Sequence, residues 1–514
     1  MKTKSILISL VFLVFCFESY CQEETHSLTI NISVAKKVSP SFNQNGRLFI
    51  YMSKHKNPSR WWPHFITKDY YVYAKNFSDW ESNEILTVTN TQDWDKWARF
   101  EECNFKNIPE GTYYIQLVWD QSFDTFGVNA EGNISSKVLM VKLNASQNID
   151  LKLSDIIKSE KLIEHKLVKL AYYKSDTLSK SYGKPVYERA AVFLPSKYYE
   201  NPDKEYPIRY HIGGGFSPYT RVSRLINDTT FYKWWLSDEA PQIITVFLDG
   251  ELNGNLYHID SDNMGPHGYS LINEFIPYIE NSYRGTLSAD NRFIDGCSTG
   301  GWASLALQLF YPETFNGCFS YSPDPISFNK FFDVNIYEDE NMFYDKYGYD
   351  RFLSKPERRS DRNISMKDWV KFENVLGYTG TYLDSDHEFG YWATIFGPKG
   401  VNGQPISLFD YETGQINSKV AESWRRYDLS HYIIDNWEDI GSKLKGKIYI
   451  WNGTADGHYL DISTRIFELE IKQLENPESD AVFEYAPNCG HCEKYSHRRV
   501  LEQIAEKLEE KNIK

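Results

Sequence analysis

The chain has 514 residues, of which 41% are hydrophobic and 25% charged, as in an ordinary globular protein. Its length allows about two to four domains. The formal net charge of -14 would repel phosphate backbones and leaves no excess of basic side chains for anionic lipid, which excludes nucleic acid as an expected partner.

The first residues, MKTKSILISLVFLVFCFESYC, place two lysines before an apolar run from Ile6 to Phe17. This run is too short to span a bilayer and is typical of a secretory signal peptide, with cleavage before Gln22. We therefore predict that residues 1–21 are removed and that the protein is secreted or periplasmic. Anchoring through a lipidated Cys21 is the alternative, but the preceding ESY is a poor signal for it. No later segment is apolar enough to cross a membrane.

Residues 22–155 show apolar side chains at alternate positions, in SLTINISVAK, GRLFIYMS, IPEGTYYIQLVWD and KVLMVKLNASQNIDLKL. This spacing, with Asn, Gly and Pro between the runs, predicts short antiparallel strands and an all-β sandwich accessory domain. Two tryptophan pairs, Trp61-Trp62 and Trp94 with Trp97, could form a carbohydrate platform. Aromatic side chains buried in the sandwich are the preferred interpretation.

A charged stretch, SDIIKSEKLIEHK, marks the boundary to a second domain over residues 156–514. Apolar runs such as YPIRYHIGGGF, QIITVFLDG, KGKIYIWNG and AVFEYAP then alternate with helical patterns such as LINEFIPYIENSY and TRIFELEIKQLEN. Repeated strand–helix units predict a mainly parallel sheet covered on both faces. The alternation of strands and helices is lost between about residues 327 and 443, and we interpret this segment as a cap inserted between consecutive strands.

Gly296-Cys297-Ser298-Thr299-Gly300 matches G-x-S-x-G, with a hydrophobic strand before it and a helix after it. The two glycines allow a strained turn that presents Ser298, and the N-terminus of the helix favours developing negative charge. We predict that Ser298 is a catalytic nucleophile. A glycine-rich connection without chemistry is the alternative.

Acyl transfer from such a serine needs donors for an oxyanion. The backbone N–H of Thr299 is the first expected donor. Gly214 and Gly215, in YHIGGGF after an earlier strand, are predicted to bring further N–H groups to the substrate. A plain turn that ends the strand is the other interpretation of these glycines.

The remaining strands supply an acid and a histidine in the order expected after the serine. Asp456 follows the strand KIYIWNG, where catalytic groups collect in open α/β sheets, and Asp461 is the rival acid. His491 follows AVFEYAP. His458 and His497 compete for the role of base.

The sequence CGHC around His491 resembles a thiol-disulfide redox site, but only residues 493–514 follow it, too few for a redox fold. Cys489 and Cys492 either close a small disulfide or remain free thiols. Zinc is not expected, because no second C-x-x-C or paired histidines complete a ligand set.

Three segments, GPHGYSLINEFIPYIENSYR, GCSTGGWASLALQLFYPETFNGCFSYSPDPISF and GTADGHYL, resemble the bacterial putative-esterase (esterase D-like) family of the α/β-hydrolase superfamily. The similarity covers residues 206–328 and 392–491. It implies an α/β-hydrolase fold, here with a large cap insertion, and a nucleophile at Ser298, an acid at Asp456 and a base at His491. The chain departs from the family at Gly457-His458, where Thr and an aromatic residue are common.

Together, these features predict a secreted serine carboxylesterase that hydrolyses small-molecule or glycan-linked acyl esters without a metal or other cofactor. A peptidase or other acyl hydrolase on the same triad is one alternative. A non-catalytic glycan-binding protein with a hydrolase-like domain is another, and thiol oxidoreduction is a third. His267, in NMGPHGYS, either contacts substrate or holds its loop by hydrogen bonds, and the structural role is preferred.

Overall fold

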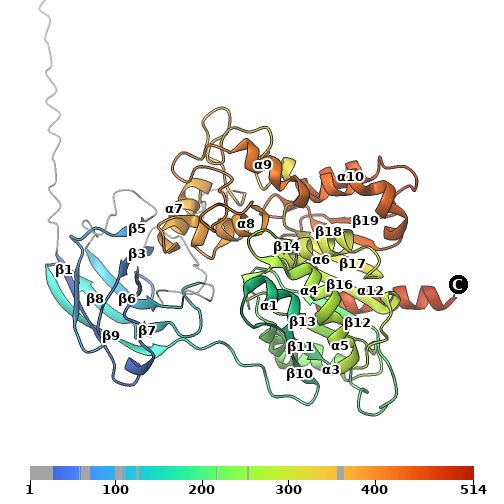
Figure 1. Ribbon diagram of the computed structural model, residues 1–514, viewed down its shortest axis with the longest axis horizontal. Coiled ribbons are helices and arrows are strands. Elements are labelled where there is room, and N and C mark those ends of the chain that lie inside the picture. Colours follow the sequence, from blue (N-terminus) through green and yellow to red (C-terminus); the bar gives the residue numbers. More distant parts are fainter. Residues whose placement is uncertain are drawn as a thin grey trace, which may run out of the picture.

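The computed structural model describes residues 27–56, 58, 70–98, 108, 110–122, 127–215, 217–251, 254–355 and 364–513. The predicted signal peptide and the Trp61-Trp62 pair lie outside these ranges. A β-rich part and a larger α/β part lie at opposite ends of the molecule, with helices of the predicted insertion between them (Figure 1). In the described part of the chain, no helix is both long and apolar enough to cross a membrane.

The amino-terminal part is β-rich, as predicted. Its elements are β1 (Leu28–Val34), η1 (Ser39–Ser41), β2 (Gly46–Ser53), β3 (Tyr70–Phe77), β4 (Leu86–Thr89), β5 (Asp95–Ala98), β6 (Gly111–Asp120), β7 (Ile134–Ser136), β8 (Leu139–Leu143) and β9 (Gln147–Ile156). Hydrogen bonds join the strands into one nine-stranded sheet in the order β4-β1-β9-β7-β6-β2-β3-β5, with β8 paired to β6. All described pairs are antiparallel except β1 with β9. The packing of two separate sheets, which a sandwich requires, stays a prediction.

Both faces of strand β2 are apolar. Leu48, Ile50 and Met52 join one hydrophobic cluster, and Phe49 and Tyr51 join another on the opposite face. Since successive side chains of a strand point to opposite faces, such a strand needs cover on both sides. The second cluster includes side chains of helix α7 (Met366–Leu376), which therefore supplies that cover.

The second part has a mixed α/β fold, as predicted. Its main sheet has eight strands in the order β10-β11-β13-β12-β16-β17-β18-β19. They are β10 (Val168–Ser175), β11 (Val186–Phe193), β12 (Ile208–Ile212), β13 (Ile244–Leu248), β16 (Arg292–Ser298), β17 (Gly317–Pro323), β18 (Ile448–Gly453) and β19 (Val482–Ala486). Every neighbouring pair from β13 to β19 is parallel, and β11 is antiparallel to both of its neighbours. The central strands are largely buried because helices cover both faces of the sheet.

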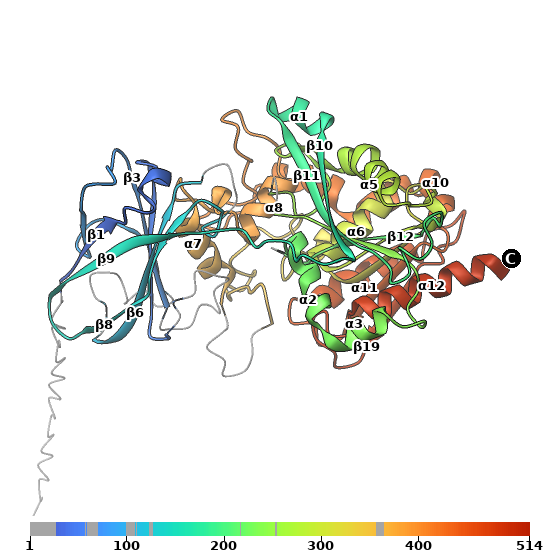
Figure 2. The same cartoon turned by 90° about the horizontal axis from the view of Figure 1, so that it is seen from below.

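Short and long helices surround this sheet (Figures 1 and 2). They are α1 (Asp176–Tyr182), η3 (Tyr219–Arg221), α2 (Val222–Asn227), α3 (Thr229–Trp235), α4 (His267–Ser270), the π-helical turn η5 (Leu271–Phe275), α5 (Ile276–Ser282), η6 (Ala289–Asn291), α6 (Thr299–Phe310), α11 (Leu460–Ile471) and α12 (His497–Ile513), with a small hairpin of β14 (Asp260–Ser261) and β15 (Gly265–Pro266). The helix predicted from LINEFIPYIENSY is thus continuous through η5 and α5.

Residues 324–447 connect β17 to β18 and contain η7 (Phe328–Lys330), α7, η8 (Tyr382–Asp384), α8 (Glu388–Phe396), α9 (Ser418–Trp424), η9 (Arg425–Tyr427), α10 (Leu429–Ile440) and η10 (Gly441–Leu444). Helix α10 contacts α6 and α11, as a crossover helix of the main sheet does. Helices α7 and α8 instead lie between the β-rich part and the main sheet in both views (Figures 1 and 2). The role of this connection as a cap over substrate stays a prediction.

Candidate active site

Ser298 ends strand β16 in a strained turn. Its backbone has φ 61° and ψ -127°, a conformation that costs free energy for any residue other than glycine. The turn depends on missing side chains, because a Cβ on Gly296 would lie 2.3 Å from the carbonyl carbon of Gly300. A Cβ on Gly300 would lie 2.2 Å from the carbonyl oxygen of Ile212. The two glycines of the motif therefore let the turn pack against strand β12.

The predicted oxyanion residues lie around this turn. Thr299 is the first residue of the 12-residue helix α6, so its N–H belongs to the unpaired donors of a helix N-terminus. A Cβ on Gly214 would lie 3.7 Å from the Cβ of Ser298, and one on Gly215 would lie 3.7 Å from Oγ1 of Thr299. The structure thus brings Gly214, Gly215 and Thr299 into contact range of the serine turn.

His491 and Asp456 form a hydrogen-bonded pair beyond the ends of strands β19 and β18. Nδ1 of His491 lies 2.9 Å from Oδ2 of Asp456, and the other carboxylate oxygen accepts from the N–H of His458 at 2.8 Å. Burial alone would raise the pKa of Asp456, but the hydrogen bond and charge of His491 hold it below its ordinary value. This carboxylate is fully buried, so it can fix the orientation of the imidazole.

The rival residues lie in other environments. Asp461 is in helix α11 and pairs with Lys355, whose Nζ lies 3.1 Å from its Oδ1. His458 is exposed, and its ring meets the edge of the His491 ring with centroids 5.1 Å apart. His497 begins helix α12 and packs against His211. Of these alternatives, only His458 adjoins the pair formed by His491 and Asp456.

A disulfide joins Cys297 to Cys492, whose Cα atoms are 6.1 Å apart. Of the two alternatives for Cys489 and Cys492, the local bridge is therefore wrong, and the free thiol is confirmed for Cys489 but not for Cys492. The pairing follows from the sheet, because the turn after β16 and the loop after β19 meet at its carboxyl edge. The bridge holds together the residue before Ser298 and the residue after His491.

A buried ion pair lies beneath the same two segments. Asp295, on strand β16, accepts two hydrogen bonds from Arg209 at 2.7 and 2.6 Å and one from the hydroxyl of Tyr495 at 3.0 Å. Burial would raise the pKa of Asp295, but Arg209 and His211 hold it well below its ordinary value. Tyr495 lies shortly after His491 in the chain. Its contact with Asp295 is therefore a second link between the serine strand and the histidine loop.

Asp324, the carboxylate that contacts the serine, was not predicted from the sequence. The hydroxyl of Ser298 donates to Oδ1 of Asp324 at 3.3 Å, rather than to His491. The other oxygen accepts from Tyr257 at 2.8 Å and from the Thr299 hydroxyl at 3.0 Å. A signal was present, since Asp324 directly follows strand β17, at the edge where catalytic groups collect.

Asp324 connects the serine to the long β17–β18 connection. Tyr257, which donates to Asp324, accepts a hydrogen bond of 2.9 Å from the indole of Trp392 on helix α8. Burial raises the pKa of Asp324, and its hydrogen bonds and the nearby His491 partly offset this effect. His491 therefore lies close enough to Asp324 for their charges to interact.

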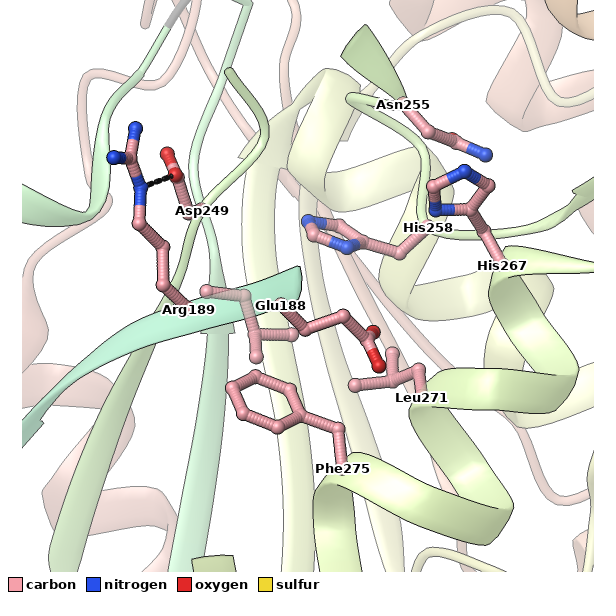
Figure 3. Close-up of a pocket in the computed structure, with 9 residues that line it drawn as sticks. Glu188, Arg189, Asp249, Asn255, His258, His267, Leu271 and Phe275 are labelled. Carbon is pink, nitrogen blue, oxygen red and sulfur yellow. Dashed lines mark hydrogen bonds and ion pairs between the residues drawn. The ribbon is translucent and has the colours of Figure 1, made fainter. Parts of the chain in front are cut away.

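His267 lies away from the serine, in a cavity beside strands β11 and β13. Figure 3 shows His267 with His258 and Glu188 around this space, whose lining includes none of Ser298, Asp456 and His491. Nε2 of His267 is 3.2 Å from the hydroxyl of Tyr182. This hydrogen bond favours the structural role, while a contact with substrate stays a prediction.

The chain was compared with known families and structures. Residues 187–499 match the family model described as "Putative esterase". A ferulic acid esterase is 16% identical, with 66% of this chain and 97% of that chain aligned and a TM-score of 0.40. FphF, a fluorophosphonate-binding serine hydrolase of Staphylococcus aureus, is 14% identical over 66% of this chain and 98% of its own, with a TM-score of 0.39. An S-formylglutathione hydrolase from Agrobacterium tumefaciens is 14% identical over 66% and 93%, with a TM-score of 0.35. Comparison with curated proteins finds no match.

Proposed function

The chain belongs to the Putative esterase family, a family of hydrolases that act on esters, and from that premise we propose a serine carboxylesterase with Ser298, His491 and Asp456 as its triad. The order of the eight strands and the antiparallel β11 support an α/β-hydrolase fold for the part that carries these residues. Export is part of the proposal and rests on the predicted signal peptide, and small-molecule or glycan-linked acyl esters are the proposed substrates.

The proposed reaction has two acyl-transfer steps. The oxygen of Ser298 attacks the ester carbonyl while His491 takes the hydroxyl proton. The carbonyl–alkoxy bond then breaks, and His491 returns the proton to the departing alcohol. In the second step His491 takes a proton from water, whose oxygen attacks the acyl carbon. The bond between this carbon and the Ser298 oxygen then breaks, His491 returns the proton to that oxygen, and the carboxylic acid leaves. Asp456 stays ionised and stabilises the imidazolium that forms in each step.

The backbone N–H of Thr299 and the loop at Gly214 and Gly215 are the proposed oxyanion donors. Thr299 stands at the N-terminus of helix α6, where the helix dipole favours negative charge. Donors fixed by the backbone need no reorganisation as charge develops on the carbonyl oxygen. Their proposed task is therefore to stabilise the tetrahedral intermediate.

One observation carries the proposal: a strained serine turn and a histidine–carboxylate pair lie on either side of the Cys297–Cys492 bridge. The resting serine donates to Asp324, so its hydroxyl must turn toward His491 before it reacts. Rotation about one side-chain bond moves such a hydroxyl between neighbouring acceptors.

A fluorophosphonate probe and aryl esters test this function. We expect the folded protein to form one covalent adduct on Ser298, located by peptide mass spectrometry, and to hydrolyse phenyl acetate. Ser298→Ala should remove the adduct and lower kcat by about 10³-fold or more. Labelling of another residue, or phenyl acetate turnover that survives the substitution, would reject Ser298 as the nucleophile.

A further inference from the structure

The hydrogen bond from Ser298 to Asp324 must break during the proposed reaction. In the structure the serine hydroxyl donates to Oδ1 of Asp324 at 3.3 Å. In acyl transfer the same proton moves to His491, and the serine oxygen bonds to the acyl carbon. Asp324 therefore loses a donor each time the enzyme turns over.

The lost donor has no replacement in the described part of the protein. Tyr257 and Thr299 both donate to Oδ2 of Asp324, whereas Ser298 is the sole described donor to Oδ1. Asp324 is only 8% exposed, so little water reaches it. A buried carboxylate oxygen without a donor costs free energy, and this cost would fall on the step in which the serine reacts.

In the proposed reaction an ester must approach the serine oxygen, which lies 3.3 Å from this carboxylate oxygen. Because its carbonyl carbon bonds to the serine oxygen, substituents on the carbons next to the ester group lie nearest to Oδ1 of Asp324. We propose that Asp324 binds a hydroxyl group close to the scissile ester, which takes over the place of the Ser298 hydroxyl. This hydroxyl lies either on the α-carbon of the acyl group or on the alcohol carbon next to the one that carries the ester oxygen. This inference rests on the proposed function of Ser298 and defines which esters that site prefers.

The charge of the site agrees with a neutral donor and opposes an anion. Glu388, on helix α8, is close enough to Asp324 that Asp324 adds to burial in raising the pKa of Glu388. Burial and Asp324 both favour the neutral form of Glu388, so the charge that would repel an acyl or alcohol group carrying a carboxylate is that of Asp324. Hydrogen bonds to an ionised acceptor are stronger than those between neutral groups, so a hydroxyl gains most from this position.

The hydroxyl could belong to the alcohol, as in a partly acylated polyol, or to the acyl group, as in a 2-hydroxy acid. Two substrate pairs distinguish these sources. The alcohol pair is 2-hydroxyethyl acetate and 2-methoxyethyl acetate, and the acyl pair is ethyl glycolate and ethyl methoxyacetate. In each pair the methyl ether keeps the oxygen and removes the donated proton.

We expect the wild-type protein to cleave the hydroxyl ester of at least one pair with a kcat/KM about 10- to 100-fold above that of its methyl ether. The pair that shows this preference identifies the source. Asp324→Ala should reduce the preference to about threefold or less, and Asp324→Asn should leave an intermediate value, because an amide oxygen is a neutral acceptor. Asp461→Asn, which removes a carboxylate of helix α11 that pairs with Lys355, should keep the wild-type preference.

Equal kcat/KM within both pairs for the wild-type protein would overturn the proposal, even if the Asp324 variants fail to fold. A preference that persists in folded Asp324→Ala would overturn it as well. Phenyl acetate carries no hydroxyl, so its hydrolysis by the wild-type protein and not by Ser298→Ala reports separately on the proposed function.

Discussion

The orientation of His491 depends on which carboxylate accepts its Nδ1–H. Asp456 lies 2.9 Å from that nitrogen and is fully buried, whereas Asp461 pairs with Lys355. Because the charge and hydrogen bond of His491 keep the pKa of Asp456 below its ordinary value, the carboxylate stays ionised through neutral pH. It can therefore hold one tautomer of the imidazole.

Asp456→Asn should lower kcat for phenyl acetate by about 10⁴-fold, since an amide in place of the carboxylate favours the wrong tautomer and removes a charge. Asp461→Asn serves as the matched control and should stay within about threefold of the wild-type rate. Steady-state kinetics at pH 7 on both purified variants provide the measurement. A larger loss in Asp461→Asn than in Asp456→Asn would reverse the assignment of the acid.

At the scale of residues, the sequence predicted the features that depend on local chain geometry. The turn at Ser298 depends on the neighbouring glycines, and Asp456 and His491 lie in the loops that follow apolar strands. Asp324 was missed because its contacts with Ser298 and Tyr257 depend on how separate strands lie side by side. Neither alternative for Cys492, a bridge to Cys489 or a free thiol, included its partner Cys297, since pairing depends on distance in space and not on the spacing of C-x-x-C.

At the scale of elements, the disulfide joins the end of strand β16 to the loop after β19. It closes a segment with a sequence separation of 195, so it removes many conformations from the unfolded chain. It also fixes the distance between the elements that carry Ser298 and His491. We therefore expect the disulfide to contribute to both the free energy of unfolding and the rate of ester hydrolysis.

Cys492→Ser should lower the free energy of unfolding by about 2–5 kcal/mol and reduce kcat/KM for phenyl acetate. Cys489→Ser, at the neighbouring buried thiol, should have the smaller effect on both quantities because it leaves the bridge intact. Thermal unfolding and kinetics of the two variants, with peptide mapping of unreduced protein, test this. Equal behaviour of the variants would show that the bridge is not needed by the site.

The sequence also predicted most strands of the main sheet, because buried parallel strands are rich in apolar residues, even where β12 and β16 carry the buried pair Arg209 and Asp295. It was less informative between β17 and β18. Helix α10 lies within the predicted insertion of residues 327–443, yet it packs against α6 and α11 of the main sheet. A long irregular segment precedes this helix, so the strand–helix alternation could not be followed from the sequence alone.

At the scale of the whole molecule, the β-rich part contacts the connection that reaches the serine. Arg47, which is 1% exposed, donates to the Val375 carbonyl of helix α7 at 2.9 Å and to Asp95 at 2.7 Å. The N–H of Gly127 donates to Asp386, just before helix α8, at 3.0 Å. Trp392 of helix α8 donates a hydrogen bond to Tyr257, which in turn donates to Asp324.

These contacts join residues hundreds of positions apart, so no periodicity or local motif could predict them. The sequence indicated two domains and an insertion, but not that α7 would cover one face of the amino-terminal sheet. The interface nevertheless connects the β-rich part to the serine through helices α7 and α8, Tyr257 and Asp324. Its predicted accessory role can thus be tested through activity.

Arg47→Ala should lower kcat/KM for phenyl acetate by about 3- to 10-fold, because α7 loses a buried anchor and α8 with Trp392 is held less firmly. Lys75→Ala is the control and should keep the wild-type rate, since within the described residues Lys75 donates to the Asp93 carbonyl of the same β-rich part. Kinetics well below the unfolding temperature, with circular dichroism to confirm folding, separate a local effect from loss of structure. If Arg47→Ala remains folded and fully active, the β-rich part does not influence the serine through this interface, and its contribution must be sought in substrate binding instead.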